Sequence, residues 1–253
     1  MKSLWDDTAA LVFADDPLQL RVYTSRLLGQ EPALVMHGGG NTSVKMQLDH
    51  FFGEPEEVLC IKGSGWDLAT IEAAGFAPVK LDVLQRQAQL EKLTDTEMVN
   101  VQRSAMTDPN APNSSVEAVL HAIVPGTFVD HTHVDAAVAI TNTPNGETAV
   151  RDIHGDRVLV VPYVMPGFIL ARTVFAPSRT GAGRLCALGA IAQYAQAHGS
   201  QRVHRAGHSP EPAETCQLSI RTGGGCHRCK QCGQEGEPAG PVLRIPEPDR
   251  AVW

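Results

Sequence analysis

Two histidines separated by one residue lie between apolar segments, and this pattern constrains the chain more than any other. His131 and His133 are flanked by residues 125–129 and 136–140, in which β-branched and other apolar residues predominate. Such segments favour a β-strand, and a strand directs residues i and i+2 to the same face. We therefore expect the two imidazoles to point together, as two ligands of a zinc ion would. An ordinary half-buried histidine pair is the alternative interpretation.

The composition is typical of a soluble globular protein. The chain has 253 residues, of which 43% are hydrophobic, and this suffices for the core of one large α/β domain or of two small ones. Residues 1–7 include two acids and no long apolar run, so we expect neither a signal peptide nor a membrane span. Before residue 176 the only cysteine is Cys60, and one unpaired thiol suits a reducing cytosol. We therefore expect a cytoplasmic protein.

The composition changes abruptly at about Ala176. Beyond this point arginine strongly outnumbers lysine, phenylalanine and asparagine are absent, and five of the six cysteines occur. Such a shift is typical of GC-rich DNA translated in the wrong frame. We therefore divide the chain into residues 1–175 and an atypical tail, residues 176–253, and hypothesise that the tail is out of frame and disordered. Translation of the gene in its other frames would test this.

The tail also offers a second metal-binding pattern. Cys226, Cys229 and Cys232 have the Cys-x-x-Cys-x-x-Cys spacing, and Cys216, His208 or His227 could complete a tetrahedral site. No second cysteine pair follows at a suitable distance, and the glycine-rich surroundings favour a flexible chain. The arginine excess has no interleaved aromatic residues, so we do not expect nucleic-acid binding.

Two glycine-rich loops follow apolar segments that we expect to be short strands. Residues 33–36 lead into the loop 37–43, and residues 58–61 lead into the loop 62–67. Small residues let backbone amides approach a ligand closely, and the neighbouring hydroxyl groups could hold a phosphate. Neither loop has the spacing of a P-loop or of a dinucleotide-binding turn. We expect a small sugar phosphate as the ligand, with plain glycine-rich turns as the alternative.

Three helices are predicted from apolar periodicity and capping signals. Residues 17–30 form the first, residues 81–106 form one or two helices interrupted by a capping signal at Thr94–Glu97, and residues 114–123 form the last. Ser114 and Glu117 have the spacing of a capping box. Glu117 is therefore either a helix cap or a carboxylate that acts as an acid and base in a site.

Five segments, in this order, resemble the class II aldolase/adducin superfamily. The closest resemblance is to the aldolase part of bifunctional proteins that join a rhamnulose-1-phosphate aldolase to a short-chain dehydrogenase, and it covers about residues 1–175. The segments are HGGGNTSVK (37–45), IKGSGWD (61–67), SVE (115–117), DHTH (130–133) and VPYVMPG (161–167).

This resemblance implies a three-layer α/β fold, with a mainly antiparallel central sheet flanked by helices, usually assembled as a homotetramer. It also implies a zinc ion on three histidines and reversible aldol cleavage to dihydroxyacetone phosphate and an aldehyde. His131 and His133 would be two zinc ligands, and Glu117 would be the acid and base. The phosphate would be held by Gly40, Asn41, Ser64, Gly65 and Ser115. Val116 stands where simpler members have a second serine.

The third histidine decides between two functions. His198 is the candidate, although residues 189–197 resemble an Ala/Gln helix rather than the apolar strand that the family has there. With a third ligand we expect a zinc-dependent aldolase for a ketose 1-phosphate of the rhamnulose or fuculose type, and an epimerase or dehydratase would be a variant on the same fold. Without it we expect a truncated, non-catalytic relative.

Overall fold

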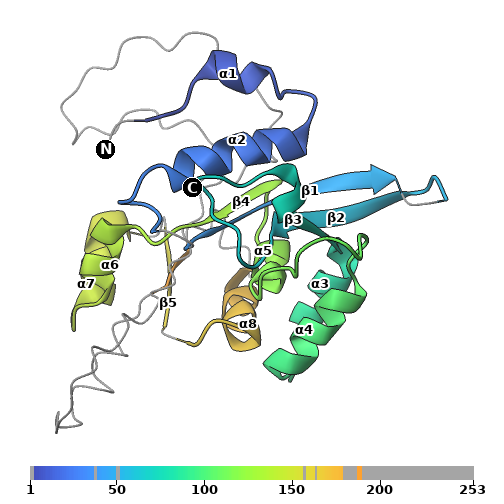
Figure 1. Cartoon of the computed structure of the whole chain (residues 1–253). Helices are drawn as coiled ribbons and strands as arrows, with labels where there is room; N and C mark the ends of the chain where they lie inside the picture. Colours follow the sequence, from blue (N-terminus) through green and yellow to red (C-terminus); the bar gives the residue numbers. More distant parts are fainter. Residues whose placement is uncertain are drawn as a thin grey trace, which may run out of the picture.

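The described part of the chain forms helices around a small antiparallel sheet (Figure 1). The computed structural model describes residues 3–36, 39–49, 52–155, 158–162, 164–178 and 187–189. Most of the tail, including His198 and its five cysteines, lies outside these residues. The hypotheses of a wrong-frame tail and of a second metal module therefore stay predictions.

The central sheet has the strand order β3-β2-β1-β4, and each neighbouring pair is antiparallel. This confirms the expected α/β fold with an antiparallel sheet. The strands β1 and β2 form a long hairpin that projects from the body (Figure 1). The four strands are β1 (Asn41–Asp49), β2 (Pro55–Lys62), β3 (Phe76–Lys80) and β4 (Phe128–His131). A separate parallel pair joins β5 (Leu159–Val161) to β6 (Ala187–Gly189).

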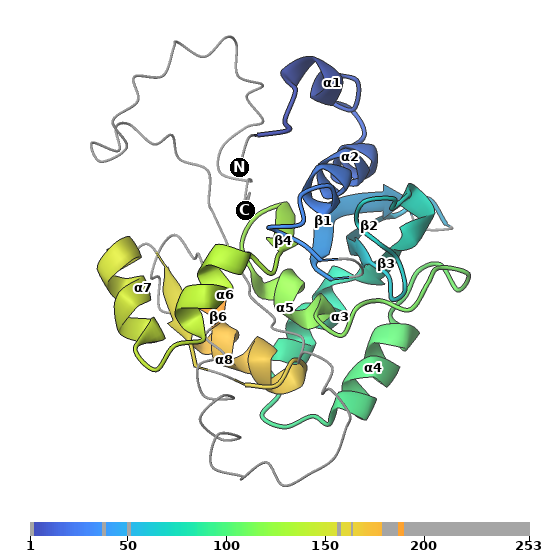
Figure 2. The same ribbon diagram turned by 60° about the vertical axis from the view of Figure 1, so that its left-hand side comes forward.

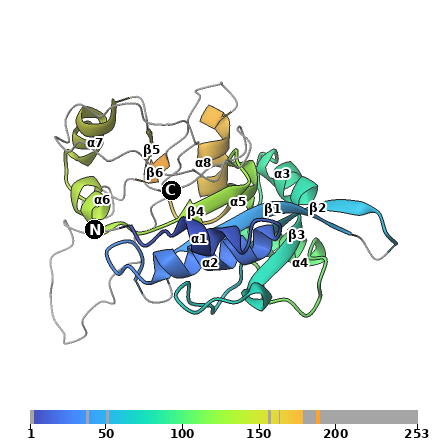
Figure 3. The ribbon, with the colours of Figure 1, turned by 90° about the horizontal axis from the view of Figure 1, so that it is seen from above.

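Helices cover both faces of the central sheet, so the core is divided by the strands. Val58 and Cys60 of β2 pack in the cluster that includes α2 (Pro17–Gly29). The alternate residues Leu59 and Ile61 pack in the cluster on the other face. Figure 3 shows α2 crossing the sheet on one side. The opposite face carries α3 (Leu81–Ala88), α5 (Ala118–Ile123) and α8 (Phe168–Ser178), with α4 (Asp95–Ser104) beside α3.

The remaining elements lie at the edges of this core. A short helix, α1 (Asp7–Leu11), precedes α2, and a 3-10 turn, η1 (Ala73–Gly75), leads into β3. The helices α6 (Asp135–Thr141) and α7 (Gly146–His154) pack on each other, on the opposite side of the molecule from the β1–β2 hairpin (Figure 2).

The helix boundaries follow local chemistry. Asp16 caps α2 by accepting a hydrogen bond from the Gln19 amide at 3.0 Å, and Pro17 occupies the first turn. The expected break in residues 81–106 is confirmed, because Thr94 and Glu97 form a capping box at the start of α4. Helix α2 ends at Gly29, as expected.

Three sequence predictions were wrong in detail. Residues 33–36 form no strand: residues 33 and 34 lie in a turn and residues 35 and 36 are irregular. Two carbonyls of this segment, those of Ala33 and Leu34, accept hydrogen bonds from the amides of residues 135 and 133, without forming a ladder. Residues 136–140 belong to the helix α6, so the strand with His131 ends before them. Helix α5 begins at Ala118, four residues after the expected start at Ser114.

None of the helices in the described part of the chain is long and apolar enough to cross a membrane.

Candidate metal and catalytic site

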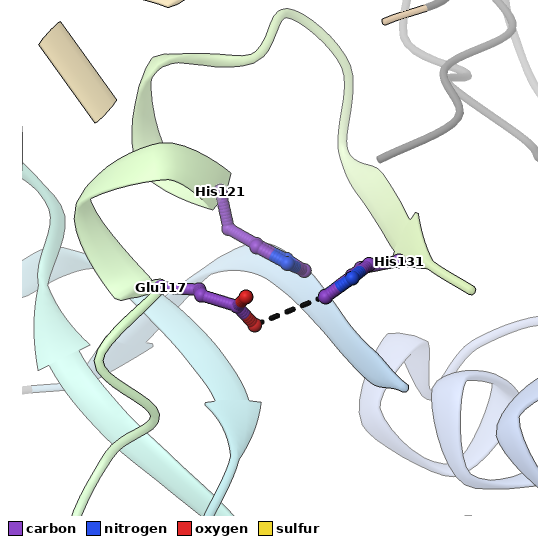
Figure 4. A group of neighbouring side chains, drawn as sticks. All are labelled: Glu117, His121 and His131. Carbon is purple, nitrogen blue, oxygen red and sulfur yellow. Dashed lines mark hydrogen bonds and ion pairs between the residues drawn. The ribbon is translucent and has the colours of Figure 1, made fainter. Parts of the chain in front are cut away.

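The candidate site lies where β4, the first turn of α5 and the beginning of β1 meet. His131 is the last residue of β4, and Asn41, the first residue of β1, is its partner in the antiparallel ladder. Glu117 immediately precedes α5, which packs on this face of the sheet. In Figure 4 the side chains of Glu117, His121 and His131 point toward one another from α5 and β4.

The rings of His131 and His133 face each other. Their Nε2 atoms are 3.2 Å apart and their ring centroids 4.9 Å apart. His133 lies just beyond the strand, and its amide donates a hydrogen bond to Leu34 O at 2.9 Å, which holds it beside His131. In tetrahedral zinc sites, Zn–N bonds of about 2.0–2.1 Å separate two nitrogens by roughly 3.3–3.4 Å. The two nitrogens therefore have the separation that two ligands of one zinc ion require.

The Glu117 carboxylate orients His131 from the other side. Its Oε2 accepts hydrogen bonds from His131 Nδ1 at 3.0 Å and from Asn41 Nδ2 at 3.1 Å. A proton held on Nδ1 leaves the lone pair of His131 on Nε2, which faces His133, as in carboxylate–histidine–zinc arrangements. The alternative in which Glu117 forms a capping box with Ser114 is wrong. Glu117 makes no side-chain cap hydrogen bond, and the Ser114 hydroxyl donates to Gln102 instead.

His121 is a further member of the site that the sequence analysis missed. It is completely buried, its Nδ1 lies 2.8 Å from Ser43 Oγ, and its Nε2 has no hydrogen-bond partner among the described residues. Glu117, His121 and His131 each offer a ligand atom, and these atoms lie within 4.8 Å of one another. The i, i+4 spacing of Glu117 and His121 on one helix face was the signal that could have identified it.

Burial keeps two of these imidazoles neutral. Burial is the largest cause that lowers the pKa of His121 to about 3 and the pKa of His133 to about 4, with a smaller contribution from the neighbouring His131 and an opposing one from Glu117. A metal ion needs imidazole in its neutral form, because a protonated nitrogen has no lone pair to donate. At neutral pH both rings are therefore ready to bind a metal ion without losing a proton.

The residues expected to hold a phosphate lie on three adjacent segments. Asn41 donates from Nδ2 to Ser115 Oγ. A bridge between Gly63 and Ser114 joins the second glycine-rich loop to the segment before α5. Ser64 in that loop donates its amide to Asn113 O at 2.9 Å.

The two glycines of this set differ in their surroundings. Gly40 has a φ of +72°, and a Cβ there would lie 3.0 Å from His131 O. Gly65 has a φ of +88°, and a Cβ there would meet nothing within 4 Å. Gly40 is therefore required both by its backbone conformation and by its close approach to β4, and Gly65 by its conformation alone.

His198 lies outside the described residues, so its expected role as a third zinc ligand stays a prediction.

Residues 19–199 match the family described as the class II aldolase and adducin N-terminal domain. The chain belongs to this family. The matched range includes Glu117, His121, His131, His133 and also His198. The fold described above is thus that of a class II aldolase/adducin domain, and the fold alone does not fix the reaction.

Two relatives are 40% identical in sequence to this chain over the regions that match. The first is a protein of Bacillus subtilis named "Uncharacterized oxidoreductase YuxG", matched over 174 residues, 69% of this chain and 25% of that protein. The match thus spans a quarter of the length of that curated relative. The second is the structure of the N-terminal class II aldolase domain of a Thermoplasma acidophilum protein, with a TM-score of 0.64 over 70% of this chain and 80% of that one.

The relationship to fuculose phosphate aldolases is distant. The structure of L-fuculose-1-phosphate aldolase from Thermus thermophilus is 17% identical, with a TM-score of 0.39, over 66% of this chain and 74% of that one.

Proposed function

We propose that this class II aldolase domain is a zinc-dependent sugar-phosphate aldolase. Its substrate would be a ketose 1-phosphate of the rhamnulose or fuculose type, cleaved to dihydroxyacetone phosphate and an aldehyde. The observation that carries the proposal is the arrangement of His131 between two partners. Its Nδ1 lies 3.0 Å from the Glu117 carboxylate, and its Nε2 lies 3.2 Å from that of His133.

The residues present fit a zinc ion. His131 and His133 would hold it through Nε2, because those atoms have a suitable separation and His133 is neutral at pH 7. A third ligand would come from His198 or from His121, one ligand atom of which lies within 4.8 Å of a ligand atom of His131. A zinc ion held there would supply Lewis-acid chemistry for the negative charge that develops when the carbon–carbon bond breaks.

Glu117 would carry out the proton transfers. Glu117 directly precedes the helix α5, its side chain is 11% exposed, and its carboxylate accepts two hydrogen bonds through Oε2. These bonds favour the ionised form, which is the form that can remove a proton from the substrate hydroxyl. In the reverse direction the protonated carboxyl group would return that proton.

The substrate phosphate would be bound by Gly40, Asn41, Ser64, Gly65 and Ser115. The hydrogen bond between Asn41 and Ser115, and the bridge between Gly63 and Ser114, support this by joining the three segments next to Glu117. Both N–H groups of the Asn41 amide are already donated, to Ser115 and to Glu117. Asn41 could therefore contact a phosphate only after giving up one of these bonds. By analogy with the family, the active form would be a homotetramer.

The alternative function is that of a non-catalytic relative in which the metal site is incomplete. It differs from the first proposal in a measurable property, which is the zinc content of the purified protein. An aldolase of this type would contain close to one zinc ion per chain, and the non-catalytic relative would contain none.

The zinc content of the wild-type protein and of a His131→Ala/His133→Ala variant tests the proposal. We expect close to one zinc per chain in the wild type and almost none in the variant. A His154→Ala variant, altered on α7, is the matched control and should keep its zinc. An absence of zinc from the wild type would favour the non-catalytic relative, and zinc that survives in the double variant would indicate that the metal binds elsewhere.

A further inference from the structure

Every second residue at the beginning of β1 makes a polar contact with the segment that contains α5. These residues are Asn41, Ser43 and Lys45, which we call the β1 polar row. Alternate residues of a strand face the same side, and the polar row faces the side on which α5 packs. The contacts are spread along the whole helix, one near its beginning, one in its last turn and one just after its end.

The first two contacts reach the site residues directly. Asn41 Nδ2 donates to Glu117 Oε2 at 3.1 Å, at the residue before α5. Ser43 Oγ lies 2.8 Å from Nδ1 of His121, four residues further along. Both Ser43 and His121 are completely buried, so water does not replace this hydrogen bond when it is lost.

The third contact holds the end of the helix. Lys45 Nζ donates to Val124 O, the residue that follows α5. Burial lowers the pKa of Lys45 to about 8, which agrees with an ammonium group enclosed between strand and helix. Cations near a helix C-terminus interact favourably with its unpaired carbonyls.

The opposite face of β1 is held by a separate set of contacts. Thr42, also completely buried, has its Oγ1 2.8 Å from Ser25 Oγ of α2. Arg21 of the same helix donates to Ser43 O at 3.4 Å. Thr42 and Ser43 are thus neighbours in sequence with equal burial and one hydroxyl contact each, but they face different sides of the sheet.

We propose that Ser43 and Lys45 are positioning residues that fix α5 against β1 and thereby hold the Glu117 carboxylate on Nδ1 of His131. The inference rests on the proposed roles of Glu117 and His131. Neither Ser43 nor Lys45 touches the facing Nε2 atoms of the histidine pair; they act through His121 and through the end of the helix. Outer residues that orient metal ligands typically change metal affinity by roughly 10–100-fold when they are removed.

The pair of variants Ser43→Ala and Thr42→Val separates this role from ordinary stability. Each removes one buried hydroxyl group from the same strand. We expect both to lose stability in urea unfolding to a similar degree. Only Ser43→Ala should also weaken Zn²⁺ binding, by roughly tenfold or more in competition with a chromophoric chelator, and shift the His131 ring from its Nδ1–H form in ¹⁵N NMR spectra.

A second variant covers the case in which Ser43→Ala does not fold. Lys45→Met keeps the length of the side chain but removes the donor to Val124, and Lys45→Arg restores a donor. We expect Lys45→Met to shift the His131 tautomer and weaken Zn²⁺ binding, and Lys45→Arg to recover part of both.

The outcomes are distinct. If Ser43→Ala and Lys45→Met both keep the wild-type tautomer and Zn²⁺ affinity, the positioning role is wrong and the row only stabilises the fold. A wild-type protein that binds no Zn²⁺ would contradict the proposed function instead, and the NMR comparison of the tautomers would still decide the positioning role.

Discussion

Arg21 and Asp130 form a buried ion pair, with Nη1 of Arg21 2.6 Å from Oδ1 of Asp130 and both side chains at most 5% exposed. Asp130 precedes His131 in β4, so the pair lies on the face of the strand opposite the site. The guanidinium also lies over the Phe128 ring, 5.6 Å from its centroid. Burial lowers the pKa of Arg21, and the attraction of Asp130 opposes this effect. The ion pair thus ties α2 to the strand that carries a proposed zinc ligand.

Replacing one partner of this ion pair should lower the free energy of unfolding strongly, whereas replacing both partners should lower it much less. Arg21→Met leaves the buried Asp130 without its cation, and we expect a loss of about 3–5 kcal/mol in the free energy of unfolding. The double variant Arg21→Met/Asp130→Leu should recover most of this loss, because neither charge is then buried. Urea unfolding of the wild type, the single variant and the double variant measures these differences in stability. Equal losses in the single and double variants would contradict the prediction.

Glu117→Gln should separate metal binding from turnover. The amide keeps the size of the side chain but cannot take a proton, so we expect turnover to fall by roughly 10²–10⁴-fold. Both proteins are compared at saturating Zn²⁺, where we expect the metal site to be filled in each of them. Release of dihydroxyacetone phosphate from rhamnulose 1-phosphate and fuculose 1-phosphate is the assay. Glu97→Gln, in the exposed capping box of α4, is the control. Unchanged turnover in Glu117→Gln would exclude it as the acid and base.

The metal-free protein should lose stability as the pH falls below about 6.5. Between that pH and about 3, the unfolded chain binds a proton at His121 that the folded protein does not bind, because burial lowers the pKa in the fold. Stability therefore falls with falling pH, by about 1.4 kcal/mol per pH unit for this group.

A His121→Asn variant isolates this contribution. It removes the titrating ring, so its unfolding free energy, measured at several pH values, should depend less steeply on pH than that of the wild type. The same slope in both proteins would show that His121 is protonated in the folded protein.

Gly29→Ala should destabilise the junction between α2 and the loop after β2. A Cβ at this position would lie 2.2 Å from Ala69 N and 2.5 Å from Leu68 C, so the backbone must move. Overpacking of this kind typically costs about 1–3 kcal/mol. Gln30→Ala, at the exposed next residue, is the control and should change the thermal midpoint little. A Gly29→Ala variant as stable as the wild type would mean that α2 shifts freely.

Elements with strong local signals could be predicted from the sequence. The capping box at Thr94 and Glu97 sets the start of α4, and the apolar run of residues 58–61 indicated a strand, which the structure contains as part of β2. Predictions were wrong where tertiary contacts outweigh local preference. The apolar residues 33–36 look like a strand, but their backbone pairs only singly with residues 133–135.

The candidate site could also be predicted only where a local sequence pattern marks its residues. The spacing of His131 and His133 indicated that they converge, although His133 is held by Leu34 O and not by strand geometry. His121 was not found, because a histidine within an apolar helix resembles a core residue. Arg21 was also missed, since its partner Asp130 is far away in sequence and only the fold brings the two together.

Because side chains alternate between the two faces along β1, the domain should not tolerate insertions or deletions at the beginning of this strand. A substitution in the polar row removes one contact, but a single-residue insertion between Asn41 and Val44 would turn the rest of the strand over. Lys45 would then face α2, and Val44 would take its place against the end of α5. The pairing of β1 with β2 continues as far as Asp49 and Pro55, beyond the residues that reach α5. We therefore expect insertions and deletions between β1 and β2 to be tolerated, and those at the beginning of β1 to disrupt the domain.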